Sequence, residues 1–105
     1  MTRSPDTVRF SVRALADLDA IHTYTLEKWG PEQARTYMLD LITFARRLPN
    51  TRYAWRKLRR RGETVYAARR ASHVLIFDAR PQSLRIIAVV HARSDFSRTP
   101  PAPPS

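Results

Sequence analysis

The sequence predicts an α+β fold, with the element order β-α-α-β-β-β, in which a helical hairpin packs on an antiparallel sheet. An alternation of apolar and polar side chains at residues 8–12 predicts an opening strand. Apolar residues then recur every three or four positions through residues 13–48, as they do in amphipathic helices. Three further apolar segments with short turns between them follow residue 62. At 105 residues, the chain has room for one core and hence for one domain.

The first helix is predicted to follow the opening strand directly. Between residues 15 and 29 apolar side chains recur on one side of a helix, and Trp29 is among them. Tyr24 and Trp29 are expected in the core, since aromatic platforms for base stacking usually lie on an exposed sheet or groove. Gly30 suits the end of this helix, and Pro31 suits the first turn of the next one. This short connection makes the two helices an antiparallel hairpin.

The second helix is predicted from an apolar repeat through residues 34–48, and Pro49 ends it. An Arg-rich connector follows at residues 51–62. Three strands are then predicted at residues 63–69, 72–77 and 84–91. A continuous apolar run at residues 74–77 is typical of a central strand that is covered on both sides. Because short turns join these strands, we expect an antiparallel meander with the helices on one face.

The domain is predicted to span residues 1–98. Residues 99–105 hold four of the eight prolines and are expected to form a disordered tail. No apolar run approaches the roughly 20 residues that a membrane-spanning helix needs. Cysteine is absent, and Met1 is followed by no apolar stretch of the signal-peptide kind. We therefore expect a cytoplasmic protein without a membrane partner.

The positive charge is concentrated in the second part of the chain. There are 19 basic and 9 acidic side chains, a net charge of +10, and 17 of the cations are arginine. Residues 41–105 hold 14 of the basic side chains and three acidic ones. Arginine grips phosphate or carboxylate groups in a bidentate manner, so this pattern predicts an anionic partner, either a nucleic acid or an acidic protein segment. The alternative is a solvated face that only aids solubility.

Aromatic and basic residues are interleaved around the connector. Such a mixture binds nucleic acid or anchors a partner peptide, although the aromatics equally suit the anchoring of a loop. The residues predicted to bind a partner are Tyr53, Trp55, Arg56, Lys57, Arg59, Arg60, Arg61, Arg69, Arg70 and Arg93.

One reaction that needs no metal, the cleavage of RNA, is compatible with the residues of this chain. RNA is cut when a base activates its own 2′-hydroxyl while an acid and a cation assist. The candidate set for this chemistry is Arg61, Tyr66, Arg69, Arg70, His91 and Arg93. For His91 and His73 a structural role is the favoured interpretation. The histidines show no metal-binding spacing, and two glycines exclude a Gly-rich phosphate loop, so neither a metal nor a cofactor is expected.

Four segments resemble one known family when they are taken in order. Residues 16–24 resemble the A-x-x-D-L-x-x-I-x-x-Y start of the ParE branch of the RelE/ParE toxins, and residues 29–34 resemble its W-G-x-x-x-A junction. Residues 73–77 resemble its H-x-I-x-Y strand, and residues 89–96 its closing V-L-H-x-x-x-D segment. The family fold has the same order of elements as the one predicted above.

The resemblance implies the toxin of a type II toxin–antitoxin system, neutralised by the acidic segment of a ParD-like antitoxin. It implies that the chain inhibits DNA gyrase by binding it rather than by catalysis, and that it forms a heterotetramer or larger assembly with its antitoxin. Two alternatives stay open. One is a RelE-like ribosome-dependent mRNA endonuclease, which would be a metal-independent enzyme, and the other is a non-toxic nucleic-acid-binding domain.

Overall fold

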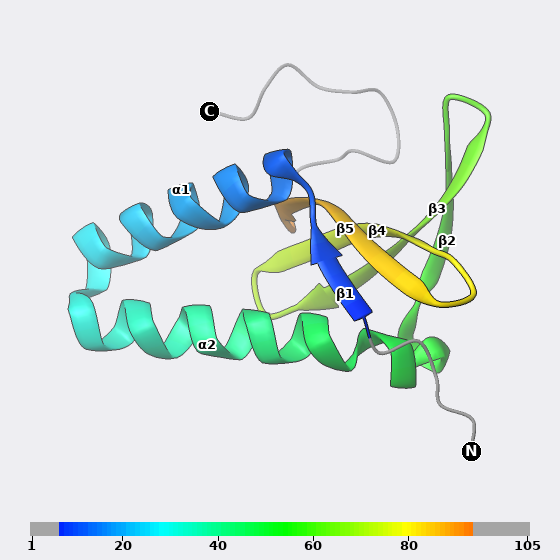
Figure 1. The fold of residues 1–105 in the computed structure, drawn as a ribbon. Coiled ribbons are helices and arrows are strands. Elements are labelled where there is room, and N and C mark those ends of the chain that lie inside the picture. The colour runs from blue at the N-terminus through cyan, green and yellow to red at the C-terminus, as the bar shows by residue number, and fades with distance from the viewer. Residues whose placement is uncertain (1–6, 94–105) are drawn as a thin grey trace.

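The helical hairpin lies on one face of a five-stranded sheet, as Figure 1 shows for the computed structural model. The structure describes residues 7–93, so the predicted domain boundary at residue 98 and the Pro-rich tail lie outside the described residues. In chain order the elements are β1 (Thr7–Phe10), α1 (Val12–Trp29), α2 (Pro31–Arg47), β2 (Arg56–Arg60), β3 (Glu63–Arg70), β4 (His73–Ala79) and β5 (Ser83–His91). Two short 3-10 turns, Leu48–Asn50 and Arg52–Ala54, connect α2 to β2. The predicted α+β fold class is confirmed.

The sheet has the order β1-β5-β4-β3-β2 and contains one strand that the sequence did not predict. Strand β2 lies within the connector, where it pairs antiparallel with β3 from Arg56 opposite Ala67 to Arg60 opposite Glu63. The first strand also differs from the expectation, because β1 pairs parallel with β5. The sheet is therefore mixed, with β1 at one edge and β2 at the other.

The ends of α1 are fixed by local hydrogen bonds. The Ser11 hydroxyl accepts from the backbone N–H of Ala14 at 3.0 Å, which satisfies one of the free donors at the helix start. At the other end Gly30 has a φ of 94°, a conformation that only glycine adopts without strain, and its N–H donates to the carbonyl of Leu26. Pro31 then opens α2. The Gly-Pro junction thus ends one helix and starts the next, as predicted.

The two faces of the sheet carry separate apolar clusters. The larger cluster lies between the sheet and the hairpin, and Leu41, Leu75, Phe77 and Ile86 are buried there. The smaller cluster lies on the outer face and consists of Val65, Ala67, Val74, Ile76 and Ala88. The continuous apolar run of β4 is explained by this arrangement, because successive side chains enter opposite clusters.

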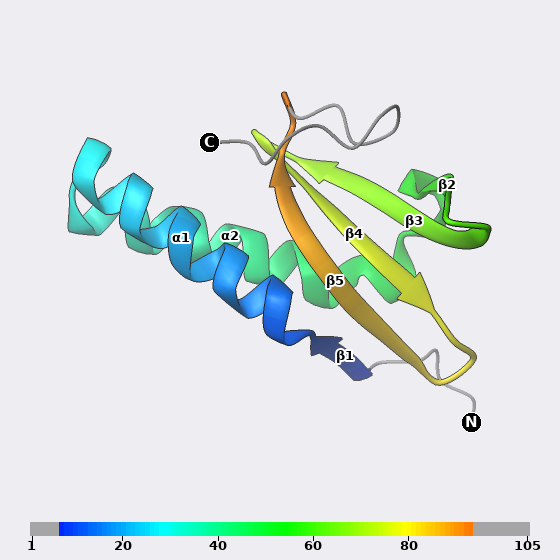
Figure 2. The same ribbon diagram turned by 90° about the horizontal axis from the view of Figure 1, so that it is seen from above.

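The far end of the hairpin, where α1 meets α2, extends beyond the edge of the sheet, as Figures 1 and 2 both show. The end of α1 that carries Trp29 therefore has no sheet beneath it. The helix is held to the sheet nearer its start, where the Asp17 carboxylate accepts the backbone N–H of Val89 in β5 at 2.9 Å. None of the described helices is long and apolar enough to cross a membrane.

Candidate functional site

Five basic residues of the connector lie on the two faces and at the tip of the β2–β3 hairpin, and together they make up its basic surface. Arg56, Lys57, Arg59 and Arg60 lie on β2, and their side chains are exposed. Arg61 occupies the two-residue turn that joins β2 to β3 and is also exposed. The ion pairs within residues 7–93 leave all five of these cations unpaired. The structure thus brings together half of the predicted partner-binding residues.

The two aromatic residues before this hairpin have different environments. Tyr53 is 88% exposed. Trp55 is half-buried, and its indole Nε1 donates to the carbonyl of Leu48 at 3.0 Å. Its ring meets that of Phe77 edge-on, with 5.0 Å between the centroids, while the Arg52 guanidinium lies 5.1 Å from the Trp55 ring. Trp55 therefore anchors the connector to the core, and Tyr53 is free to contact a partner.

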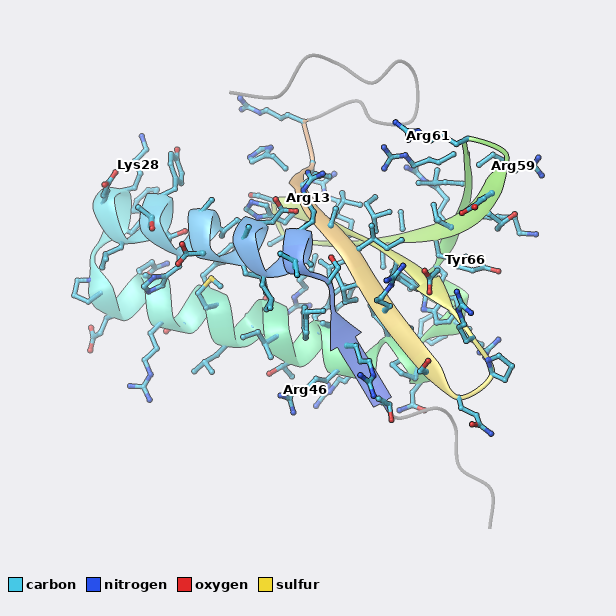
Figure 3. All side chains as sticks on the ribbon, turned by 45° about the horizontal axis from the view of Figure 1, so that its top comes forward. Arg13, Lys28, Arg46, Arg59, Arg61 and Tyr66 are labelled. Carbon is cyan, nitrogen blue, oxygen red and sulfur yellow. The ribbon has the colours of Figure 1, made fainter. Side chains whose placement is uncertain are left out.

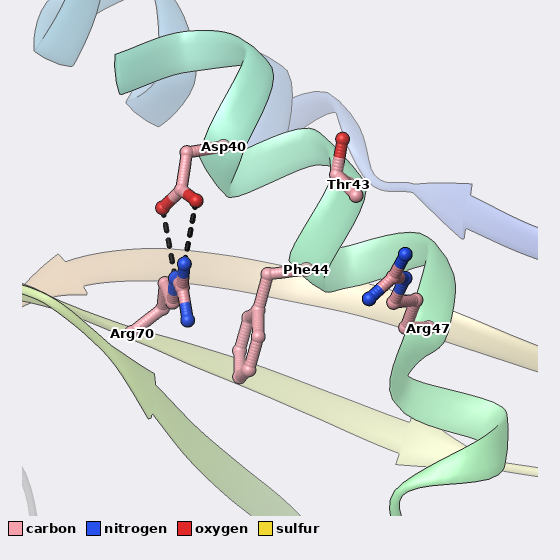
Figure 4. Close-up of a pocket in the computed structure, with 5 residues that line it drawn as sticks. All are labelled: Asp40, Thr43, Phe44, Arg47 and Arg70. Atoms are coloured by element: carbon pink, nitrogen blue, oxygen red, sulfur yellow. Dashed lines mark hydrogen bonds and ion pairs between the residues drawn. The ribbon is translucent and has the colours of Figure 1, made fainter. Parts of the chain in front are cut away.

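Arg69 and Arg70 point to opposite faces of β3, because side chains alternate along a strand. Figure 4 shows Arg70 on the helix side, where its guanidinium donates to both carboxylate oxygens of Asp40 on α2 at 2.8 and 2.6 Å. The bonded guanidinium lowers the pKa of Asp40, and the carboxylate raises that of Arg70. The Arg70 guanidinium also lies 5.8 Å from the Phe44 ring. Arg69 instead donates to the carbonyl of Ala71 at 2.9 Å.

Asp40 was not among the residues predicted from the sequence. Together with Thr43, Phe44, Arg47 and Arg70 it lines a shallow pocket between α2 and β3. The sequence gives no clear signal for Asp40, because it lies beside the apolar repeat of the second helix and not within it. The pair fixes Arg70 in place, so this arginine positions β3 against α2.

Two histidines and a tyrosine meet at the end of the sheet where β4 begins. His73 lies opposite His91 of β5, with ring centroids 5.3 Å apart, and its Nδ1 lies 2.6 Å from the Tyr37 hydroxyl. Burial lowers the pKa of His73 to about 4, with a smaller contribution from the neighbouring His91. His91 itself is exposed, and its Nδ1 accepts the backbone N–H of Arg93 at 3.0 Å. Tyr37 also went unpredicted, because in the sequence it reads only as a core aromatic.

The candidate set for RNA cleavage does not converge on one point. On β3 and β4 Arg70 lies opposite His73, and on β4 and β5 His73 lies opposite His91. Arg70 and His91 therefore lie at the same end of the sheet. Tyr66 lies four residues back along β3, about 13 Å away at the rise of a strand, and packs against Trp55. Arg61 lies farther still, in the β2–β3 turn, and Figure 3 shows Arg61 and Tyr66 well apart.

Helix α1 presents an apolar stripe to solvent that the sequence analysis assigned to the core. Trp29 is 66% exposed, Leu15 is 54% exposed, and Leu26 is also exposed. Their spacing places these three side chains on one side of the helix, beside the buried stripe that contains Leu18. Tyr24, the other aromatic expected in the core, is 60% exposed on a different side. The prediction was wrong for Trp29 because the end of α1 extends past the sheet. It was wrong for Tyr24 because this residue lies on a side of α1 that faces away from the buried stripe.

The sequence and the structure each match known proteins. Residues 8–96 match the family model described as the ParE toxin of the type II toxin–antitoxin system parDE. No match was found among curated proteins.

Three solved complexes contain chains with the same fold. A chain of the chromosomal ParDE system from Pseudomonas aeruginosa superposes with a TM-score of 0.70 and 19% identity, over 85% of this chain and 98% of that one. A chain of the RelBE2 complex from Mycobacterium tuberculosis superposes with a TM-score of 0.63 and 24% identity, over 83% of this chain and 98% of that one. A chain of the archaeal RelE–RelB complex from Pyrococcus horikoshii superposes with a TM-score of 0.53 and 14% identity, over 85% of this chain and 97% of that one.

The family match covers β1 through β5, and the shared fold holds along nearly the full length of the three solved chains. The resemblance seen in the four sequence segments is therefore confirmed, and the chain belongs to the family of ParE toxins of type II toxin–antitoxin systems.

Proposed function

We propose that this toxin inhibits DNA gyrase by binding it, and that a ParD-like antitoxin neutralises it. The observation that carries the proposal is the family match over residues 8–96, on a fold that is shared with chains from solved toxin–antitoxin complexes. The separation of Tyr66 from His91 along the sheet supports binding rather than catalysis as the toxic activity.

The exposed stripe of α1 supports a helical antitoxin segment as the partner. An amphipathic helix that docks on another protein buries its apolar side in an apolar strip or groove. Leu15, Leu26 and Trp29 offer such a strip, and a large exposed tryptophan is the kind of residue that dominates binding energy at interfaces. We propose that the antitoxin helix lies along α1 and covers Trp29.

The basic surface supports the expectation that the antitoxin segment is acidic. Complementary charge raises the association rate and selects the partner, while apolar contacts provide most of the lasting affinity. The exposed residues that we propose for antitoxin or target contacts are Tyr53, Arg56, Lys57, Arg59, Arg60, Arg61, Arg69 and Arg93. Trp55 and Arg70, which the sequence placed in the same set, act by holding this surface in position. We propose that the neutralised complex is a heterotetramer or larger, which its mass in solution tests.

A supercoiling assay with purified gyrase tests the proposed target. The toxin should inhibit supercoiling in a dose-dependent manner, and prior mixing with its antitoxin should restore the activity. Supercoiling that is unchanged by a large excess of toxin, from a preparation that arrests growth when it is expressed, would rule gyrase out as the target.

A second candidate function rests on the row of Arg70, His73 and His91 at one end of the sheet. Exposed His91, with Arg93 beside it, offers a proton-transfer group next to a cation, as RNA cleavage requires. In this case a translation reaction should contain mRNA that is cut within the ribosome. If His91→Ala leaves toxicity intact, this alternative fails.

A further inference from the structure

We propose that the outer part of the β2–β3 hairpin is a ribbon that enters the groove of duplex DNA and contacts the phosphates on both sides of it. The ribbon consists of residues 56–65, with the turn at Arg61 and Gly62 as its tip. This inference goes beyond the proposed function, because it concerns a direct contact with DNA that needs neither gyrase nor an antitoxin.

The ribbon stands out from the sheet. Strand β4 pairs with β3 only from Tyr66 to Arg70, so residues 58–60 and 63–65 pair with each other alone. Figure 1 shows this hairpin rising beyond the other strands. The tip is tight, because Arg61 and Gly62 both have positive φ values, 52° and 81°. Two successive residues with positive φ are typical of a type I′ turn, which matches the twist of the paired strands.

Cations occupy both faces of the ribbon as well as its tip. Leu58 packs into the outer apolar cluster opposite Val65, so Arg56 and Arg60, two residues away on either side, share its face. Lys57 and Arg59 consequently lie on the other face. Figure 3 shows Arg59 and Arg61 at the far end of the hairpin, reaching away from it on different sides. Glu63 is the one acidic residue in the ribbon.

An acidic antitoxin segment accounts for part of these cations, whereas a groove with phosphates on both walls accounts for the cations of both faces together. A helix lies on one face of a ribbon, so it would leave the cations of the other face without a partner. An extended peptide added at the free edge of β2 would reach both faces, but only along that edge. It would also need apolar anchors, and Leu58 is already packed against Val65. The major groove of B-form DNA is about 12 Å wide, admits a two-stranded ribbon and has phosphates along both of its walls. Cations on two faces would then each meet a phosphate.

The ribbon also favours duplex DNA over other nucleic acids. Single strands are held mainly by exposed aromatic side chains on which bases stack, and the ribbon carries none between Arg56 and Val65. Duplex RNA has a deep and narrow major groove that protein elements do not enter. The exposed aromatic nearest to the ribbon in sequence, Tyr53, precedes β2 and lies outside it.

Fluorescence anisotropy of a labelled DNA duplex measures this contact directly. The full chain is titrated at several salt concentrations between about 50 and 200 mM, where the slope of log K against log salt counts the neutralised phosphates. Wild-type protein is compared with the variant Arg59→Gln/Arg60→Gln/Arg61→Gln. The matched control is Lys28→Gln/Arg35→Gln/Arg46→Gln, which removes the same charge from exposed helix positions. Circular dichroism of each variant checks the fold.

The ribbon variant should bind at least about tenfold more weakly at 100 mM salt, and its slope should be shallower by about 2 to 3, near the 0.9 expected per lost contact. The control should stay within about threefold of wild type, because its charges lie on the helices and are screened beyond about 10 Å. Equal losses in the two variants would overturn the proposal. So would a failure of the wild-type protein to bind the duplex, or competition by single-stranded DNA or polyglutamate that is as effective as unlabelled duplex.

Discussion

The Tyr37 hydroxyl lies 2.6 Å from Nδ1 of His73, and this hydrogen bond joins helix α2 to the first residue of β4. Because the pKa of His73 is lowered to about 4, the imidazole is neutral near pH 7. In the tautomer that carries its proton on Nε2, Nδ1 accepts from the tyrosine hydroxyl, and in the other tautomer Nδ1–H donates to it. The same ring meets His91 edge-on. The helix layer is thereby connected through His73 to strands β4 and β5.

Removal of the Tyr37 hydroxyl should destabilise the fold. Tyr37→Phe keeps the ring but leaves Nδ1 of half-buried His73 without its hydrogen-bond partner, so the free energy of unfolding should fall by about 1 kcal/mol. Urea unfolding at pH 7.5 measures the change. Tyr24→Phe, on the exposed side of α1, is the matched control and should change it by less than about 0.5 kcal/mol. Equal stabilities of the two variants would contradict this role for the hydroxyl.

The stability of the fold should depend on pH through His73. An unfolded histidine has a pKa near 6.5, and in the folded chain that of His73 is about 4, so between these values the unfolded state binds more protons. The free energy of unfolding should therefore decrease as the pH falls from about 6.5 to about 4. His73→Gln, which can still accept from Tyr37, should flatten the profile over this range in denaturant titrations. An unchanged slope in the variant would assign the dependence to other groups.

Substitutions of the two aromatic residues of the connector should affect different properties. We expect a loss of stability at Trp55 and a loss of binding at Tyr53. Trp55→Phe loses the hydrogen bond to the Leu48 carbonyl and part of the packing on Phe77, so stability should fall by about 1–2 kcal/mol. Tyr53→Ala, at an exposed position, should leave stability within about 0.5 kcal/mol of wild type but weaken the complex with antitoxin or target. Thermal unfolding together with calorimetric titration of each variant tests both expectations. A stability loss as large for Tyr53→Ala as for Trp55→Phe would contradict the assignment.

The elements that could be predicted from the sequence are those with a strong apolar period. The Gly30-Pro31 junction placed the break between the helices at the right residues, and the predicted strand at residues 84–91 agrees with β5 to within one residue. Strand β2 escaped prediction because Leu58 is the one apolar residue among its five, so no alternation is visible. This segment is a strand because it pairs with β3 across the tight turn, and its own five residues do not reveal that pairing.

Tertiary geometry decided the parts of the site that the sequence could not show. Trp29 shares the helical period of the core residues, but its exposure depends on how far α1 extends past the sheet. The parallel pairing of β1 with β5 likewise depends on tertiary structure, because these two strands are neighbours in the sheet but lie near opposite ends of the described chain. Asp40 and Arg70 are 30 residues apart, and nothing local to either one reveals their ion pair. The basic surface, in contrast, was evident from composition, since charge concentrated in one segment stays together on a hairpin.

Trp29 should be central to antitoxin binding and unimportant for folding. Its side chain is 66% exposed on α1, so Trp29→Ala removes little buried area and should leave the free energy of unfolding within about 0.5 kcal/mol of wild type. At the proposed interface the indole would be fully covered, and its loss should weaken the complex with the antitoxin about 30-fold, as expected for a dominant contact worth about 2 kcal/mol. Tyr24→Ala is the control, because Tyr24 is an aromatic of similar exposure on another side of the same helix. Surface plasmon resonance with immobilised antitoxin compares the two, and equal affinities would place the antitoxin on a different face of the toxin.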